Sequence, residues 1–235
     1  MRKSDPNGLV ASFTADTYQA WSDWVVIDQA LAGHSLAIRR KVASDALLAL
    51  AVTWEGFLSR WLIAAVNRDP NAAIQHLSDS VVSYATQQLH IPKAHIASSA
   101  ILKQHFTVAE VQRILDPANR NIVLTQHKEF KDFGRQWLSA PYAAALAKPS
   151  ARDVQVLKSI RSIRNALTHQ SSHSLSDANS TLRDGRLPRD LRLTASRNLN
   201  VAGLGRYLHA GTTSKTRLEI LHTESISIAL LLLVP

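Results

Sequence analysis

The sequence predicts a mainly α-helical protein, and three features of the chain carry that prediction. Residues 8–31 and 40–67 repeat apolar side chains at helical intervals. Residues 149–168 do the same, and they begin with Pro149 and Ser150, which are typical of a helix start. With 235 residues, 46% of them hydrophobic, the chain can bury a sizeable core. We therefore expect a helical bundle in which 40–67 and 149–168 are the two long core helices.

The segment 40–67 has the strongest pattern. Its apolar residues form one broad stripe, and Asp69 and Pro70 end the helix. At 1.5 Å per residue this helix spans about 40 Å, enough to be the central rod of a small bundle. Four tryptophans lie in the stripes of 8–31 and 40–67, so we expect them in the core rather than as stacking surfaces for bases: Trp21, Trp24, Trp54 and Trp61.

The middle of the chain predicts shorter helices. Prolines and a glycine divide residues 72–148 into four periodic segments: 81–89, 98–106, 108–115 and 130–147. Thr107 and Glu110 have the spacing of a capping box that opens the third segment. These short helices are expected to complete the core.

The C-terminal part is expected to be less regular. The serine-rich residues 170–180 predict a loop, and the glycines and weak alternation of 194–222 are compatible with a small β-hairpin. The apolar residues 226–233 could be its last strand, a dimer contact or a helix packed on the bundle. We therefore divide the chain into a helical domain, 1–175, and a basic appendage, 176–235, which completes or decorates the same domain.

Composition limits the chemistry. The 27 Lys and Arg exceed the 18 Asp and Glu, and a net charge of +9 favours a polyanionic partner such as RNA, DNA or an acidic protein. The absence of cysteine excludes disulfides, thiolate nucleophiles and zinc sites built from cysteine. Catalysis would have to use histidine, arginine, carboxylates or hydroxyls.

The chain is expected to be cytoplasmic and to have no membrane partner. Its polar N-terminus is not followed by the apolar core of a signal peptide. The apolar run 226–234 is about half the ~20 residues that a spanning helix needs.

One motif carries the chemistry. Arg164, Asn165 and His169 lie at the end of the amphipathic helix 149–168. Arginine can hold a phosphate in a bidentate grip, and histidine titrates near neutral pH. The pair is therefore suited to RNA cleavage without a metal ion or another cofactor: His169 would activate a ribose 2′-hydroxyl as general base, and Arg164 would stabilise the charged transition state.

The spacing of this motif is not specific by itself. With 18 Arg and 10 His, chance yields about two pairs separated by four to six residues. Arg120 to His127 and Arg217 to His222 also satisfy the spacing. Context favours the pair at 164 and 169, because it ends a strong helix, includes Asn165 and opens into a polar segment.

The stretch Ser162 to His169 resembles the signature of HEPN domains, in which an Arg, usually followed by Asn, Asp or His, precedes a His by four to six positions. The stretch Leu47 to Leu58 is similar to the long helix of the RiboL-PSP-HEPN branch, with the acidic Glu55 beside an aromatic residue. The resemblance implies a bundle that dimerises so that two Arg-His motifs form one composite cleft. It also implies a metal-independent endoribonuclease, a toxin or phage-defence effector, with an antitoxin protein as a further partner.

Other residues have expected supporting roles. Asn165 would orient the site or be polar surface, and Glu55 would pair with Arg164 or lie solvated on the far face of its helix. Five arginines are expected to bind RNA phosphates: Arg161, Arg183, Arg186, Arg189 and Arg192. The last four recur every three residues, but Pro188 argues against a continuous helix, and the alternative is a solvated basic loop.

Two alternatives remain for the motif itself. Arg164 and His169 could be an exposed pair that caps the carbonyls of a helix end. His169 and His173 could in principle share a metal, although no third ligand is near in sequence, so we expect no metal. The rival to a nuclease is a noncatalytic RNA- or protein-binding module whose basic tail makes the contacts.

Overall fold

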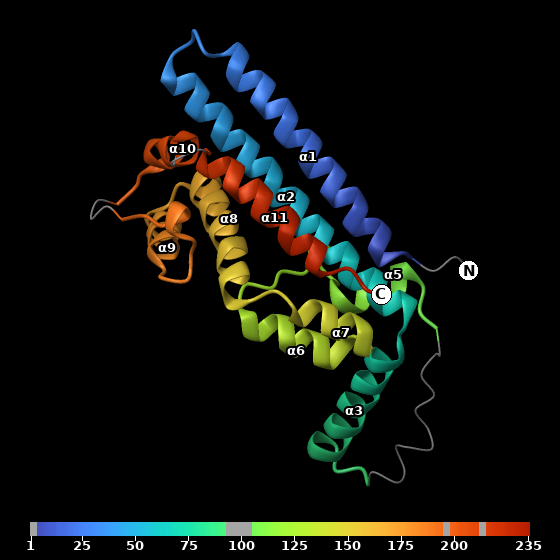
Figure 1. Ribbon diagram of the computed structural model, residues 1–235. Helices are drawn as coiled ribbons and strands as arrows, with labels where there is room; N and C mark the ends of the chain where they lie inside the picture. Colours follow the sequence, from blue (N-terminus) through green and yellow to red (C-terminus); the bar gives the residue numbers. More distant parts are fainter. Residues whose placement is uncertain (1–3, 93–104, 195–197, 212–214) are drawn as a thin grey trace.

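The structure is a computed structural model that describes residues 4–92, 105–194, 198–211 and 215–235. Over these residues the chain folds into ten α-helices and one short 3-10 helix, and the described part contains no strand (Figure 1). The prediction of a mainly helical protein is confirmed.

Two long antiparallel helices form one side of the molecule (Figure 1). α1 spans Pro6–Ala30, and Asp5 caps it by accepting a hydrogen bond from the backbone N of Asn7 at 3.1 Å. α2 spans Leu36–Arg68 and ends before Pro70, as expected. The chain ends meet at the start of α1, where the Asn7 amide donates to the carbonyl of Val234 at 2.7 Å.

The buried face of α2 builds the aromatic centre of the core. Phe13 of α1 stacks on Phe57 with ring centroids 4.4 Å apart and meets Trp54 edge-on at 5.4 Å. Trp61 is fully buried. Trp24 is also buried and stacks on the partly buried Trp21, so the four tryptophans are core residues as predicted.

Among the described helices, α2 alone is long and apolar enough, by length and composition, to cross a membrane. Within the fold, 56% of its most apolar stretch is buried against other helices. The central helix of a helical bundle meets the same criterion, because it too must be apolar on most of its surface.

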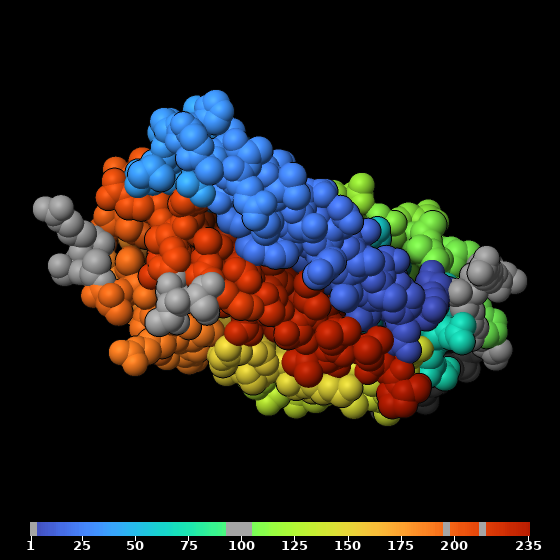
Figure 2. Space-filling model, turned by 45° about the horizontal axis from the view of Figure 1, so that its top comes forward, coloured from blue at the N-terminus to red at the C-terminus, as the bar shows by residue number. Residues whose placement is uncertain are grey.

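α8 spans Ala151–His169 and corresponds to the core helix expected over 149–168. Ser150 and Asp153 form a capping box at its start, since the Ser150 hydroxyl accepts from the backbone N of Asp153 at 3.2 Å and the Asp153 carboxylate accepts from the backbone N of Ser150 at 2.9 Å. α11, Arg217–Leu231, lies between α1 and α8 (Figure 2). The apolar C-terminal run is therefore a helix packed on the bundle, one of the three alternatives for it.

Four shorter helices complete the far end: α3, Asn71–Gln88; α5, Val108–Leu115; α6, His127–Trp137; and α7, Ala140–Ala147. Thr107 and Glu110 form the predicted capping box of α5. The expected helix 130–147 is divided in two, because Pro141 cannot donate within a continuous helix and lies in the first turn of α7. α3 begins well before the predicted start, and the expected segment 98–106 lies mostly outside the described residues.

The prediction of a serine-rich loop is wrong. α9, Ser172–Arg183, covers most of that segment. Ser171 caps it by accepting a hydrogen bond from the backbone N of Ser174 at 3.1 Å, while Ala178 and Leu182 are fully buried. Serine is a mediocre helix former, but capping and burial of an apolar face against α8 outweigh that preference.

The expected β-hairpin is not formed by the described residues either. α10, Val201–His209, occupies the region and is capped by Asn200; it is joined to α11 through an isolated bridge between Gly211 and Thr216. Gly205 lies where α10 approaches α2 closely, so this glycine serves helix packing rather than a turn.

Residues 176–235 share the main core. Leu182, Leu191, Leu204 and Leu221 belong to the same buried cluster as the helices before them. The division expected at residue 175 falls inside α9.

His222 is a polar residue inside this core. It is 3% exposed on α11, beside Trp21, and neither ring nitrogen makes a hydrogen bond of normal geometry within the described structure. Burial lowers the pKa of His222 to about 4, and the backbone of Thr17 offsets only part of that effect. The unfolded chain therefore binds a proton on His222 more readily than the folded protein does.

We expect acid to destabilise the protein through His222. Because the folded pKa lies below the unfolded value, the stability is present above about pH 6.5 and is lost as the pH falls toward 4, by about 2 kcal/mol between pH 7 and pH 5. Urea unfolding at both pH values should show a smaller pH dependence in His222→Leu. The exposed His34 provides the control. An equal pH dependence in wild type, His222→Leu and His34→Leu would contradict the prediction.

Candidate active site

α8 carries the candidate residues: Lys158, Arg161, Arg164, Asn165 and His169. Lys158, Arg161, Asn165 and His169 are successively three or four residues apart, which places them on the same side of the helix. Arg164 lies beside this row, one residue before Asn165. His169 is the last residue of α8, and it is exposed where Gln170 turns the backbone into the left-handed conformation (φ 51°).

Glu55 of α2 positions Arg164. One terminal nitrogen of Arg164 lies 3.4 Å from Glu55 Oε2, and the other donates to Asn165 Oδ1 at 2.8 Å. The Glu55 side chain is only 13% exposed, whereas that of Arg164 is 29% exposed. The Arg164 guanidinium is therefore held by Glu55 on its buried side and by the neighbouring Asn165, and part of it faces solvent. Of the two alternatives for Glu55, the ion pair is the one that the structure forms.

The site has an excess of positive charge. Arg161 Nε lies 3.9 Å from Glu55 Oε1, an oxygen that is buried and makes no hydrogen bond within the described structure. One carboxylate thus faces two guanidinium groups. A net positive charge remains on the face of α8 and is available to a phosphate.

The alternative of a carbonyl-capping pair does not describe Arg164. Thr168 Oγ1 donates to the Arg164 carbonyl at 2.9 Å, and Gln170 Nε2 donates to the Leu167 carbonyl at 3.4 Å. The guanidinium of Arg164 instead contacts Glu55 and Asn165. The ring of His169 makes no hydrogen bond or ion pair with any described residue and is accessible.

The positive face continues toward α6. A hollow of about 290 Å³ lies beside the first half of α8, and the cations that line it are Lys158, Lys128 and Arg186. A smaller hollow next to it is lined by Glu55, Lys158 and Arg161. Cations therefore run from Arg164 along α8 to the loop before the 3-10 helix.

The four expected arginines do not form one row. Arg186 pairs with Asp184 and holds the pKa of that carboxyl at about 2. Arg192 donates to the Leu187 carbonyl at 3.0 Å, and Arg183 donates to Asn198 Oδ1 at 2.9 Å. Arg189 is exposed in the 3-10 helix Arg189–Leu191. The contacts of Arg183, Arg186 and Arg192 stabilise a loop. Pro188 prevents the continuous helix that would have aligned the four arginines. Of the four, Arg186 lines the cationic hollow.

The competing Arg-His pair near the C-terminus is structural. His222 is buried, and Arg217 donates to the Asp190 carbonyl at 2.9 Å while its guanidinium lies 4.7 Å from the ring centre of Tyr207. The pair lies in α11 and not in a strand. The pair Arg120 to His127 spans the loop between α5 and α6.

No group of three or more His, Asp or Glu side chains that could hold a metal ion occurs among the described residues. His169 and His173 lie on either side of the junction between α8 and α9. The described residues offer no third ligand for this pair.

Comparison with other proteins does not assign the chain to a family. No protein-family model matches it, and no match was found among curated proteins or solved structures.

Lys158 and Lys128 lie at the site but outside the Arg-Asn-His motif. Lys158 could have been found from sequence, because it precedes Arg161 by three residues and Asn165 by seven on the same helix face. Lys128 could not, because α6 is brought beside α8 only by tertiary packing.

We expect Glu55→Gln to separate turnover from binding. Losing the carboxylate leaves Arg164 poorly oriented, so kcat for the RNA cleavage that the motif predicts should fall about 10- to 100-fold. KM should not rise, because the positive charge of the face increases. Steady-state kinetics on a short RNA measure both constants. Glu224→Gln, which breaks a comparable ion pair with Arg152 at the other end of α8, should leave both unchanged. A rise in KM with constant kcat would contradict the positioning role.

Proposed function

We propose that this chain is a HEPN-like endoribonuclease that cleaves RNA without a metal ion. One observation carries the proposal: Arg164, positioned by the nearly buried Glu55, lies five residues before the exposed His169 that ends the same helix. The resemblance of the motif to HEPN domains adds to this argument, and the cationic hollows along α8 suit an RNA backbone.

The chemistry follows from the residue types. His169 would take the proton of a ribose 2′-hydroxyl, and the resulting oxygen would attack the neighbouring phosphorus. The bond to the 5′-oxygen breaks, that oxygen takes up a proton, and the products are a 2′,3′-cyclic phosphate and a 5′-hydroxyl. Arg164 would stabilise the negative charge on the phosphate oxygens as it grows, and Asn165 would keep the guanidinium in place.

Each chain has one such motif, so a homodimer would supply the second catalytic group. We infer that two copies meet at the α8 and α2 faces, where His169 of one copy could act as base and the partner's His169 as acid. This contact would cover Val52, which is 59% exposed, and the open surface over Gly56, where no side chain blocks the approach of a second copy. A cytoplasmic toxin or phage-defence effector, held in check by an antitoxin, is the biological role that the resemblance suggests.

We expect His169→Ala to abolish cleavage. A labelled mixed-sequence RNA, incubated in EDTA, should be cut by the wild type to fragments with cyclic phosphate ends, and the variant should be at least ~100-fold slower while its affinity for RNA is kept. His173→Ala, an exposed histidine four residues away, is the matched control and should cut normally. If wild type binds RNA tightly but leaves it intact, the protein is a noncatalytic RNA-binding module instead.

We expect Val52→Glu to prevent both dimerisation and cleavage, because a carboxylate on this face would be buried against the partner without a counter-charge. Light scattering should report a monomer, and the folded helical content should be unchanged. Val26→Glu on α1 changes an equally exposed valine away from Glu55 and should remain a dimer. A monomeric wild type that cleaves RNA would show that the composite cleft is wrong.

A further inference from the structure

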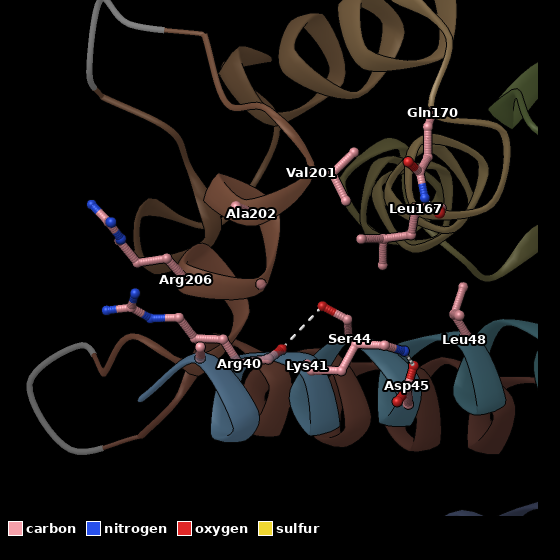
Figure 3. Close-up of a pocket in the computed structure, with 12 residues that line it drawn as sticks. Arg40, Lys41, Ser44, Asp45, Leu48, Leu167, Gln170, Val201, Ala202 and Arg206 are labelled. Carbon is pink, nitrogen blue, oxygen red and sulfur yellow. Dashed lines mark hydrogen bonds and ion pairs between the residues drawn. The ribbon is translucent and has the colours of Figure 1, made fainter. Parts of the chain in front are cut away.

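A second pocket lies beyond the end of α8 and plays no part in the cleavage step described above. It occupies about 290 Å³ between α2, α8 and α10 (Figure 3). Its size lies near the lower end of the range for small-molecule sites. Three chain segments that are far apart in sequence supply its walls.

The floor of the pocket is closely packed. A Cβ on Gly205 would lie 3.0 Å from the Arg40 carbonyl oxygen and 3.0 Å from Ser44 Oγ, so only glycine lets α10 lie this near to α2. His209, at the end of α10, is held 3.2 Å from Asp28, which also binds Arg39. α10 is therefore anchored at two places, and the pocket is preformed.

The mouth of the pocket is cationic. Arg40 comes from α2 and Arg206 from α10, and their guanidinium groups extend in the same direction at one end of the pocket (Figure 3). Neither guanidinium has a hydrogen-bond or ion-pair partner among the described residues. Lys41 pairs with Asp45 one turn later. Three cations against one carboxylate give the lining a net charge of +2, which favours an anion.

The interior of the pocket is aliphatic with two polar groups. Leu48, Leu167 and Val201 form its walls, and Figure 3 shows Ser44 and Gln170 approaching it from opposite sides. Such a slot accepts a flat or apolar group, and the hydroxyl and amide can hydrogen-bond to its edge. An anion attached to a heterocyclic base has both properties, whereas an inorganic anion would leave the walls unused.

The pocket is also close to the proposed cleavage site. Leu167 and Gln170 follow Arg164 by three and six residues, which places Gln170 about 9 Å further along the helix axis. This distance is comparable with one or two nucleotides of extended RNA. A strand with one phosphate on Arg164 could thus place a neighbouring nucleotide in the pocket.

We propose that the pocket between α2, α8 and α10 is a nucleotide subsite, which binds the nucleotide next to the cleaved phosphodiester. The base of this nucleotide would lie against Leu48, Leu167 and Val201. Its phosphate would be held by Arg40 and Arg206. The place of this nucleotide in the RNA strand rests on the proposed function. Binding of a nucleoside phosphate by the pocket does not.

The test measures binding first, without cleavage. Uridine and adenosine 5′-monophosphates, uridine and inorganic phosphate are titrated into the full chain by calorimetry. We expect the monophosphates to bind with a Kd of ~0.1–1 mM. Uridine and inorganic phosphate, each of which is only part of the nucleotide, should bind more weakly. Arg206→Ala should weaken monophosphate binding at least tenfold, and Ala202→Leu should block the slot without changing charge. Arg113→Ala removes an exposed arginine on α5, near the other end of α2, and should bind as wild type does.

A second arm uses RNA. In the His169→Ala background, Arg206→Ala should weaken binding of a short RNA several-fold, and uridine monophosphate should compete for that RNA. The pocket proposal is overturned if no monophosphate binds saturably, or if Arg206→Ala and Ala202→Leu both bind like wild type. Monophosphate binding by a chain that never cuts RNA would reject the nuclease while keeping the pocket. Cleavage with no monophosphate binding would reject the pocket alone.

Discussion

Burial of α2 is the constraint on which the rest of the structure depends. This helix is apolar on so much of its surface that α1, α5, α8, α10 and α11 all pack against it. The driving force is removal of large side chains such as Trp61 and Phe57 from water, at roughly 25 cal/mol for each Å² of apolar surface. Each of these helices must turn its own apolar stripe toward α2. This requirement determines the rotation of each helix about its axis and its direction across α2.

Glu55 is a charged residue in the middle of this apolar helix, and its contacts explain how the site is built. A carboxylate that is nearly buried costs free energy unless charged groups face it. Arg161 and Arg164 face it from α8, and this pairing links the rotation of α8 to that of α2. The same rotation brings Lys158, Asn165 and His169 to the accessible side. The ion pairs of Glu55 thus fix the packing of α8 on α2 and also position the residues of the proposed site.

The two proposed sites lie on either side of the end of α8. Its last turn carries His169 outward, while Leu167 and Gln170 turn toward α2 and α10. The left-handed conformation at Gln170 ends the helix there and allows α9 to fold back along α8. Both sites therefore depend on where α8 stops, and a longer α8 would separate Arg206 of α10 from the phosphate proposed to lie on Arg164.

Local signals in the sequence were enough for the long helices and the motif. The periodicity of 40–67 and 149–168, the capping box at Thr107 and the position of Arg164 and His169 at a helix end are all readable from neighbours in the chain, because 3.6-residue periodicity and caps are short-range effects. Only the tertiary structure decided the rest. α9 and α10 have few strong helix formers and become helical because they bury leucines against α8 and α2. The ion pairs of Glu55 join α2 to residues more than 100 positions later, and the pocket shared by Arg40 and Arg206 also joins distant segments. No short-range rule states which distant side chains will meet.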